Sequence, residues 1–243
     1  MLNEAIVLAG GLGTRLRSVV ADVPKPMAPI GGRPFLEHLF DHWIDQGIRR
    51  FTLSVGYRHE VITGHFGSTY RGVALRYTVE EKPLGTGGAL LRTLRTFRIE
   101  APVLLLNGDT YFAVDLGRLC AFAANSEADA AFALFETTDR ARYMGMDLDA
   151  QGRILQLQAQ DRSPHLANGG VYWLRPGIFA GQAAAAEHLQ SLEADLLPAL
   201  LRAGRKLYGR AFPGTFIDIG VPDDFRRAQD LLPTVGRVGH ASC

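Results

Sequence analysis

Apolar runs and amphipathic stretches alternate along most of the chain. Short runs of consecutive apolar residues, bounded by Gly, Pro, Asn or Asp, are typical of strands that are buried on both faces. Stretches with apolar residues three and four positions apart are typical of helices, and Leu36, Leu39, Phe40 and Trp43 share one such face. The pattern predicts strands at 4–10, 49–56, 73–80, 102–109, 168–174, 206–212 and 215–220, and helices at 35–48, 59–67, 85–97, 115–126, 192–204 and 222–232.

This alternation predicts an α/β fold of the Rossmann-like kind, a mostly parallel sheet with helices on both faces. Residues 143–158 depart from the pattern, because two alternating runs flank a turn signal and so predict a small β-hairpin insertion. The final helix is expected to have Pro222 near its start, with Asp223 or Asp224 as its cap. Residues 1–232 are predicted to form a single domain, and the small, polar stretch 233–243 a disordered tail.

Composition narrows the class of protein. The chain has 243 residues and a formal net charge of +1, which gives no basic face for a nucleic acid partner. Its two cysteines, Cys120 and Cys243, are too few for a disulfide framework, and Cys120 is expected to be a small buried apolar residue. The sequence shows neither a signal peptide nor an apolar run long enough for a membrane span. We therefore expect a cytoplasmic protein with no membrane partner; a homo-oligomer remains open.

A glycine cluster follows the first predicted strand, in the stretch "LAGGLGTRL". It lacks the third glycine of the dinucleotide fingerprint, which disfavours a dinucleotide-dependent oxidoreductase, and it lacks the terminal Gly-Lys-Ser/Thr of a P-loop. Asp109 and Asp218 each follow a predicted strand, and a third charged residue, Lys25, lies near the glycine loop. Two prolines flank Lys25 and are expected to hold it in an extended, rigid stretch. In an open parallel sheet, ligands bind outside the carboxyl ends of the strands, so these groups are expected to meet.

The chemistry of these groups is that of phosphoryl or nucleotidyl transfer. Backbone N–H groups of a glycine loop can cradle a triphosphate, and Arg15 offers a fork of donors for phosphate oxygens. Lys25 adds a second positive charge, and two carboxylates at strand ends can hold Mg²⁺. Each feature taken singly also fits a structural role, such as a tight turn or a solvated lysine. Their combination favours the catalytic interpretation.

The order of the motifs resembles the sugar-1-phosphate nucleotidylyltransferase family. The similarity runs through "LAGGLGTRL", "PKPMAPIGGRPFLEHLFD", "EEKPLGTGGAL", "LLLNGDTYF", "NGGVYWL" and "FIDIGVPDDFRRAQ", and covers roughly residues 3–232. The resemblance implies a Rossmann-like nucleotide-binding fold. It also implies an enzyme that joins an NTP to a sugar 1-phosphate, releasing pyrophosphate, with Mg²⁺ as cofactor.

The resemblance also implies roles for individual residues. Arg15 would stabilise the leaving pyrophosphate, Lys25 the region of the α-phosphate, and Asp109 and Asp218 would bind Mg²⁺. The stretch from Gly85 to Gly88 would line the nucleoside pocket. The residues implied to bind the nucleotide are Leu8, Ala9, Gly10, Gly11, Gly13, Thr14, Glu80, Pro83, Gly85, Thr86 and Gly108, and those implied to bind the sugar are Asn168, Gly169 and Arg162.

Two positions bear on the choice of substrates. Glu80 occupies the family's base-reading position, and a carboxylate can accept from both N1–H and the 2-amino group of guanine, which favours GTP. The motifs are most similar to the heptose 1-phosphate guanylyltransferase branch; UTP, mannose 1-phosphate and N-acetylmuramate 1-phosphate stay open. The family's Glu-Lys pair after the hairpin is replaced by Ala159 and Gln160, so Arg162 is a candidate substitute. This departure also leaves open a nucleotide-binding regulatory subunit with impaired acceptor turnover.

Overall fold

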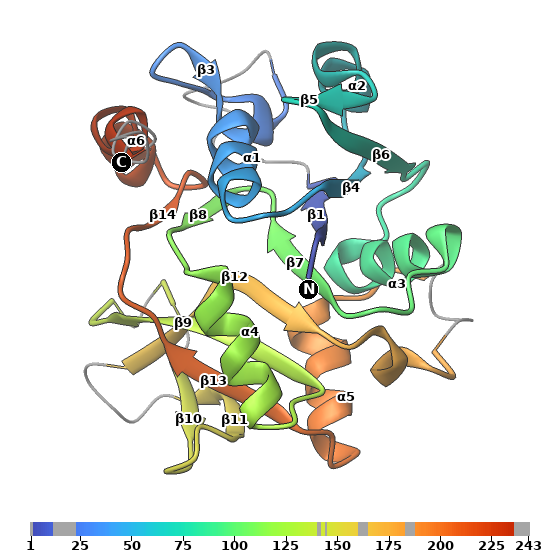
Figure 1. Ribbon diagram of the computed structural model, residues 1–243, viewed down its shortest axis with the longest axis vertical. Helices are drawn as coiled ribbons and strands as arrows, with labels where there is room; N and C mark the ends of the chain where they lie inside the picture. Colours follow the sequence, from blue (N-terminus) through green and yellow to red (C-terminus); the bar gives the residue numbers. More distant parts are fainter. Residues whose placement is uncertain are drawn as a thin grey trace.

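The computed structural model describes residues 2–11, 23–139, 142–143, 145–159, 165–182 and 188–235. Four parallel strands form the centre of its main sheet (Figure 1). Each follows one of the continuous apolar runs, and each ends at the same edge of the sheet because the strands are parallel. In spatial order they are β6 (Val73–Val79), β4 (Arg50–Val55), β1 (Glu4–Ala9) and β7 (Val103–Asn107).

The strand β12 (His165–Leu174) joins this parallel centre to antiparallel strands. One edge of β12 pairs with β9 (Ala130–Thr137), and the other pairs with β7 and with β10 (Gly145–Leu148). The sheet is therefore mixed with a parallel centre, which confirms the predicted Rossmann-like α/β class. Three further strands complete it: β5 (Thr69–Tyr70) beside β6, β11 (Ile154–Ala159) beside β10, and β13 (Leu207–Ala211) beside β9.

Helices cover both faces of the sheet, as the alternation of β1 requires. Ala5 and Val7 belong to one fully buried cluster, whereas Ile6 belongs to a second cluster on the opposite face. The predicted face of Leu36, Leu39, Phe40 and Trp43 packs into the first cluster. Helices α1 (Phe35–Asp45), α2 (His59–Phe66) and α4 (Leu116–Asn125) lie on the first face, and α3 (Gly85–Phe97) and α5 (Leu197–Arg202) on the second.

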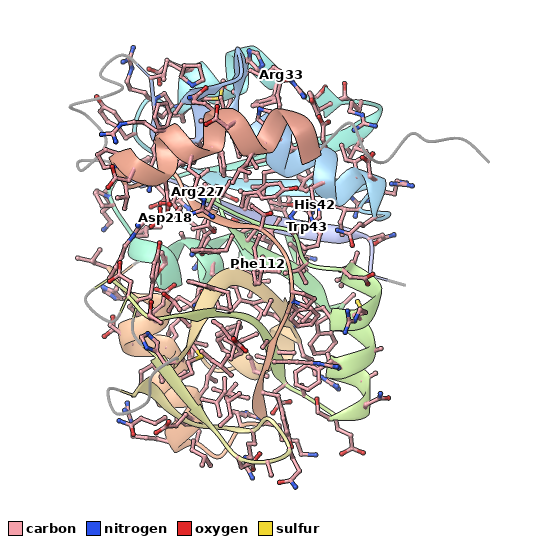
Figure 2. The ribbon with its side chains drawn as sticks, turned by 90° about the vertical axis from the view of Figure 1, so that its left-hand side faces the viewer. Arg33, His42, Trp43, Phe112, Asp218 and Arg227 are labelled. Carbon is pink, nitrogen blue, oxygen red and sulfur yellow. The ribbon has the colours of Figure 1, made fainter. Side chains whose placement is uncertain are left out.

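A small two-stranded sheet lies beside the main one and holds the end of the chain in place. Strand β8 (Thr110–Phe112) pairs antiparallel with β14 (Phe216–Asp218). Helix α6 (Pro222–Val235) packs on this pair through a third buried cluster. Arg227 of α6 donates from Nη2 to the carbonyl oxygen of Phe216 at 3.0 Å (Figure 2). Helix α6 thus fixes the strand that ends in Asp218.

Several sequence predictions differ in detail from the structure. The hairpin β10–β11 exists, with Gly152 at φ 85° in its turn, but β10 pairs with β12, so the hairpin is an edge of the main sheet. Helix α6 continues to Val235, past the predicted end at 232. Leu192–Leu196 form a π-helical turn ahead of α5. Residues 236–243 lie outside the described residues. No helix in the described ranges combines the length and apolar character that crossing a membrane requires.

Candidate active site

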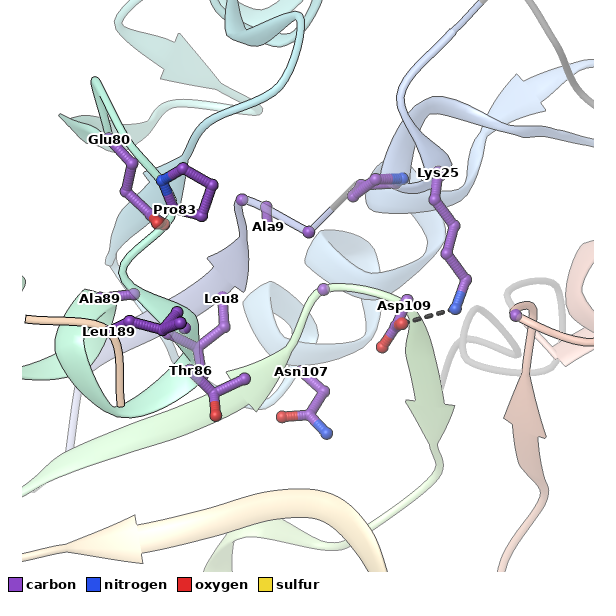
Figure 3. Close-up of a pocket in the computed structure, with 16 residues that line it drawn as sticks. Leu8, Ala9, Lys25, Glu80, Pro83, Thr86, Ala89, Asn107, Asp109 and Leu189 are labelled. Atoms are coloured by element: carbon purple, nitrogen blue, oxygen red, sulfur yellow. Dashed lines mark hydrogen bonds and ion pairs between the residues drawn. The ribbon is translucent and has the colours of Figure 1, made fainter. Parts of the chain in front are cut away.

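A cavity of about 400 Å³ opens at the carboxyl ends of β1 and β7 (Figure 3). This is the edge where the topology predicted a ligand, because the chain crosses to opposite faces of the sheet there. Eleven of the predicted site residues line it: Leu8, Ala9, Gly10, Gly11, Lys25, Glu80, Pro83, Gly85, Thr86, Gly108 and Asp109. Gly13, Thr14, Arg15 and Arg162 lie outside the described residues.

Lys25 lies between the two aspartates at one end of the cavity. Its Nζ atom is 2.5 Å from Oδ2 of Asp109 and 3.5 Å from Oδ1 of Asp218. The lysine side chain is only 13% exposed, so these ion pairs are screened by water less than surface pairs are. Asp109 lies 84 positions after Lys25 in the sequence, and Asp218 lies further still. The fold thus brings both carboxylates to one ammonium group.

The segment that carries Lys25 is a short 3₁₀ turn, Lys25–Met27. The flanking prolines predicted an extended stretch, because a residue before proline disfavours helical angles. Pro24 is extended, at φ −62° and ψ 145°, but Met27 N donates to Pro24 O at 2.7 Å and Ala28 N to Lys25 O at 3.0 Å. These two hydrogen bonds close the turn, and they outweigh the preference of a residue before proline for an extended backbone. The backbone at Lys25 is therefore a tight turn, and the prediction of an extended stretch was wrong.

Tight turns place the two aspartates next to each other. Gly108 N donates to Leu8 O at 2.9 Å, and a Cβ on Gly108 would lie 2.6 Å from that oxygen, so only glycine allows β7 to turn here. Asp109 follows at once. Its carbonyl oxygen accepts from Ile219 N at 3.1 Å, and Asp218 pairs with Thr110 across β8 and β14. The backbone therefore fixes both carboxylates.

The donor set fits a divalent cation. Oxygen ligands from two carboxylates, completed by phosphate oxygens and water, are what Mg²⁺ prefers. The described part of the chain contains no group of three or more His, Cys, Asp or Glu that could hold a metal by protein ligands alone. A cation held by Asp109 and Asp218 would therefore need oxygen atoms of water or of a bound ligand to complete its coordination sphere.

Glu80 lies at the other end of the cavity, directly after β6. Its Oε1 accepts from Ser54 Oγ and its Oε2 from Leu84 N, both at 3.1 Å. Burial raises the pKa of the Glu80 carboxyl, because the charged form loses hydration. Oε1 lies so close to Gly10 that a Cβ there would collide with it. Since a carboxylate has about four lone-pair sites, Glu80 retains capacity to accept from a ligand.

The motif "GTGG" at the start of α3 serves two purposes. Gly85 and Thr86 line the cavity, and Gly85 and Gly88 also pack closely against residues 188–191, which we call the strap. Gly87 N donates to Gln190 O at 2.9 Å, and a Cβ on Gly88 would lie 2.6 Å from His188 O. The strap thus occupies the N-terminus of α3. Of the four residues expected to line the nucleoside pocket, Gly85 and Thr86 line this cavity and Gly87 and Gly88 do not.

A second cavity of about 200 Å³ lies beside the first and contains Asn168. Gly170, at φ 72°, forms a bulge in β12, and its N–H donates to Asn168 Oδ1 at 3.0 Å. The Asn168 amide also donates to Tyr172 Oη at 2.5 Å, which fixes its direction. Gly169 packs against Phe112 and is not among the residues lining either cavity: the second is lined by Arg142, Tyr143, Met146, Leu157, Ala167, Asn168, Glu193 and Leu197.

Arg142 is a charged residue that sequence reasoning missed. It lines the second cavity, and its Nη2 lies 2.7 Å from Asp224 Oδ2 and 3.7 Å from Asp218 Oδ2. Its Nε is buried without a hydrogen-bond partner within the described structure. No motif marks this arginine, because its importance comes from a contact with residues more than 70 positions away. The first cavity also contains five unpredicted residues: Pro26, Ala89, Asn107, Leu189 and Gly220.

Comparison with known proteins gives a consistent result. Residues 4–234 match the nucleotidyl transferase family model. The chain is 41% identical over 230 residues to D-glycero-alpha-D-manno-heptose 1-phosphate guanylyltransferase of Aneurinibacillus thermoaerophilus, covering 94% of this chain and 98% of the relative. It is 40% identical over 225 residues to the enzyme of that name from Campylobacter jejuni, covering 91% and 96%.

Solved structures agree with the sequence relatives. The crystal structure of HddC from Yersinia pseudotuberculosis complexed with GMP-PN matches with a TM-score of 0.81 and 30% identity, covering 94% of this chain and 99% of that one. A Bacillus anthracis protein described as a putative glucose-1-phosphate thymidylyltransferase matches at 0.79 and 22% identity over 94% of both chains, which supports the fold alone. The fold, the cavity and the family model lead to one conclusion: the chain belongs to the nucleotidyl transferase family.

Proposed function

We propose that the protein transfers GMP from GTP to a heptose 1-phosphate, releasing pyrophosphate and giving GDP-heptose. The observation that carries this proposal is the cavity itself, which has Glu80 at one end and Lys25 and Asp109 at the other. Asp218 does not line the cavity but contacts Lys25 there. A nucleoside triphosphate has a hydrogen-bonding base at one end and anionic phosphates at the other, so its polarity matches that of the cavity. The two relatives that are 40% and 41% identical bear the name of this activity.

The base specificity rests on Glu80. Its oxygens already accept from Ser54 and Leu84, which leaves lone pairs that face the cavity. Guanine offers two adjacent donors, N1–H and the 2-amino group, whereas uracil offers one. Two donors can use the remaining lone pairs of this partly buried carboxylate better than one donor can, so guanine should be preferred over uracil at this position.

The reaction is an in-line displacement at the α-phosphorus. An oxygen of the sugar phosphate forms a bond to the α-phosphorus while the bond to the bridging oxygen of the leaving pyrophosphate breaks. Lys25 lies where it can neutralise charge on the α-phosphate, and the glycine loop Gly10–Gly11 offers backbone N–H groups without side chains in the way. We assign the metal role to Asp109 and Asp218, which would hold Mg²⁺; the bound cation would neutralise phosphate charge in the transition state.

The acceptor needs a positive charge that the usual Glu-Lys pair would supply. Gln160 and Arg162 lie outside the described residues, so the role assigned to Arg162 stays a prediction. Arg142 is a second candidate, because it lines the cavity that contains Asn168 and lies 3.7 Å from the proposed metal ligand Asp218. An acceptor phosphate held by Arg142 would lie near Asp218. We place the enzyme in the cytoplasm, where GTP is available.

A pyrophosphate-release assay tests the proposal directly. GTP and UTP should be paired in turn with heptose 1-phosphate, mannose 1-phosphate and N-acetylmuramate 1-phosphate, with and without Mg²⁺. We expect kcat/KM for GTP with heptose 1-phosphate to exceed every other pair by about tenfold or more. Equal kcat/KM for GTP and UTP would show that Glu80 does not select guanine. If no pair released Mg²⁺-dependent pyrophosphate, the proposed enzymatic function would fail, and a nucleotide-binding regulatory subunit would be the alternative to test.

The Gly220→Ala variant tests whether the position of Lys25 limits turnover. A Cβ on Gly220 would collide with Lys25 Nζ and lie 2.8 Å from Asp218 Oδ1. The flexible lysine would move away, so we expect kcat to fall by about tenfold to a hundredfold while the thermal midpoint hardly changes. Gly64→Ala in α2 is the matched control, because a Cβ there meets nothing within 4 Å. Equal kcat in the two variants would contradict the role of Lys25.

Arg142→Ala tests the acceptor site. Losing a charge-assisted hydrogen bond costs about 1.5–3 kcal/mol, so kcat/KM for the sugar phosphate should fall about tenfold to a hundredfold, with KM for GTP unchanged. Arg226→Ala, which removes an exposed arginine of α6, is the control. Arg162→Ala measured alongside separates the two candidates. An unchanged acceptor KM in Arg142→Ala would reject Arg142.

A further inference from the structure

The strap, residues 188–191, presents an apolar side chain to the nucleotide cavity. Leu189 is 73% exposed, yet it is one of the residues that line this cavity. Single exposed leucines are common on protein surfaces and need no explanation. Leu155 is also exposed, at 60%, and lies on the hairpin strand β11. Leu189 differs from it because Leu189 lines the cavity in which we propose that a nucleotide binds.

The backbone of the strap is held firmly in this place. Gln190 N donates to Leu84 O at 2.8 Å, and Gln190 O accepts from Gly87 N at 2.9 Å. Ser191 N donates to Asp195 Oδ2 at 2.8 Å, and Ser191 Oγ accepts from Ala194 N at 3.0 Å. The residues after Leu189 therefore fix its Cα, and the glycines of α3 allow the close approach. A fixed backbone under an exposed side chain presents a preorganised contact surface.

The wall to which Leu189 belongs is apolar. Leu8, Pro83 and Ala89 line the same end of the cavity. In Figure 3, Leu189 lies with Leu8, Thr86 and Ala89 on one side of the pocket, and Lys25 and Asp109 lie on the other. The triphosphate belongs with the charged groups. The apolar side is left for the base and ribose, whose faces carry few hydrogen-bonding groups.

We propose that Leu189 is a nucleoside-positioning residue, which packs on the base or ribose of the bound nucleotide and orients it toward Glu80. This inference rests on the proposed function, because it takes the ligand to be a nucleotide. A bound nucleotide would cover the exposed side chain of Leu189. Removing this apolar surface from water would contribute to the free energy of binding. Its effect should fall on ligands that have a nucleoside and not on a bare polyphosphate.

Titration calorimetry of the full chain with GTP and with inorganic tripolyphosphate tests this, in the presence of Mg²⁺. We expect Leu189→Ala to raise the dissociation constant for GTP about fivefold to tenfold, and to leave that for tripolyphosphate unchanged. Leu189→Met should restore most of the affinity, since it keeps the apolar contact. Leu155→Ala, the matched exposed leucine, should bind GTP like the unmodified chain.

The outcomes separate this inference from the proposed function. If the unmodified chain bound no GTP, the proposed function would fail. If it bound GTP and Leu189→Ala bound equally well, the positioning role would be overturned while the function stood. Equal weakening of GTP and tripolyphosphate binding in Leu189→Ala would also overturn it, because the residue would then act through the structure of the strap.

Discussion

The shared ion pair of Lys25 with Asp109 and Asp218 is the interaction on which the site depends. It joins the 3₁₀ turn after the glycine loop, the end of β7 and the end of β14. Two like charges held side by side repel each other, so a cation between them is needed for the fold to keep them there. In the proposed reaction Lys25 would bind phosphate, and Asp109 and Asp218 would bind the metal. The fold therefore holds one positive and two negative charges together at the site.

Glycines make this arrangement possible where backbones must approach closely. Gly108 lets β7 turn against β1, Gly220 leaves room for Lys25, and Gly85 and Gly88 leave room for the strap. A side chain at any of these positions would displace the neighbouring group. The glycine content of the motifs thus reflects contacts between distant segments as well as contacts with phosphates. This explains why only part of "GTGG" faces the cavity.

Sequence patterns predicted the parts of the molecule that are governed by local rules. Apolar runs identified the parallel strands, and the residues at the ends of β1 and β7 were correctly expected to meet. The pattern could not reveal Arg142, because its role comes from contacts with Asp218 and Asp224 across the fold. It also could not reveal Leu189, since an exposed leucine has no signature. Residues whose importance lies in long-range packing need the structure.

The most direct test of this account is Mg²⁺-dependent pyrophosphate release by Asp109→Asn and Asp218→Asn. Asparagine keeps the size of aspartate but removes the charge that the metal and Lys25 need. Asp223→Asn, at an 83% exposed side chain of α6, serves as the control. We expect both site variants to lose turnover by about a thousandfold while keeping their circular dichroism spectra, and the control to retain it. Full activity in either site variant would contradict the account.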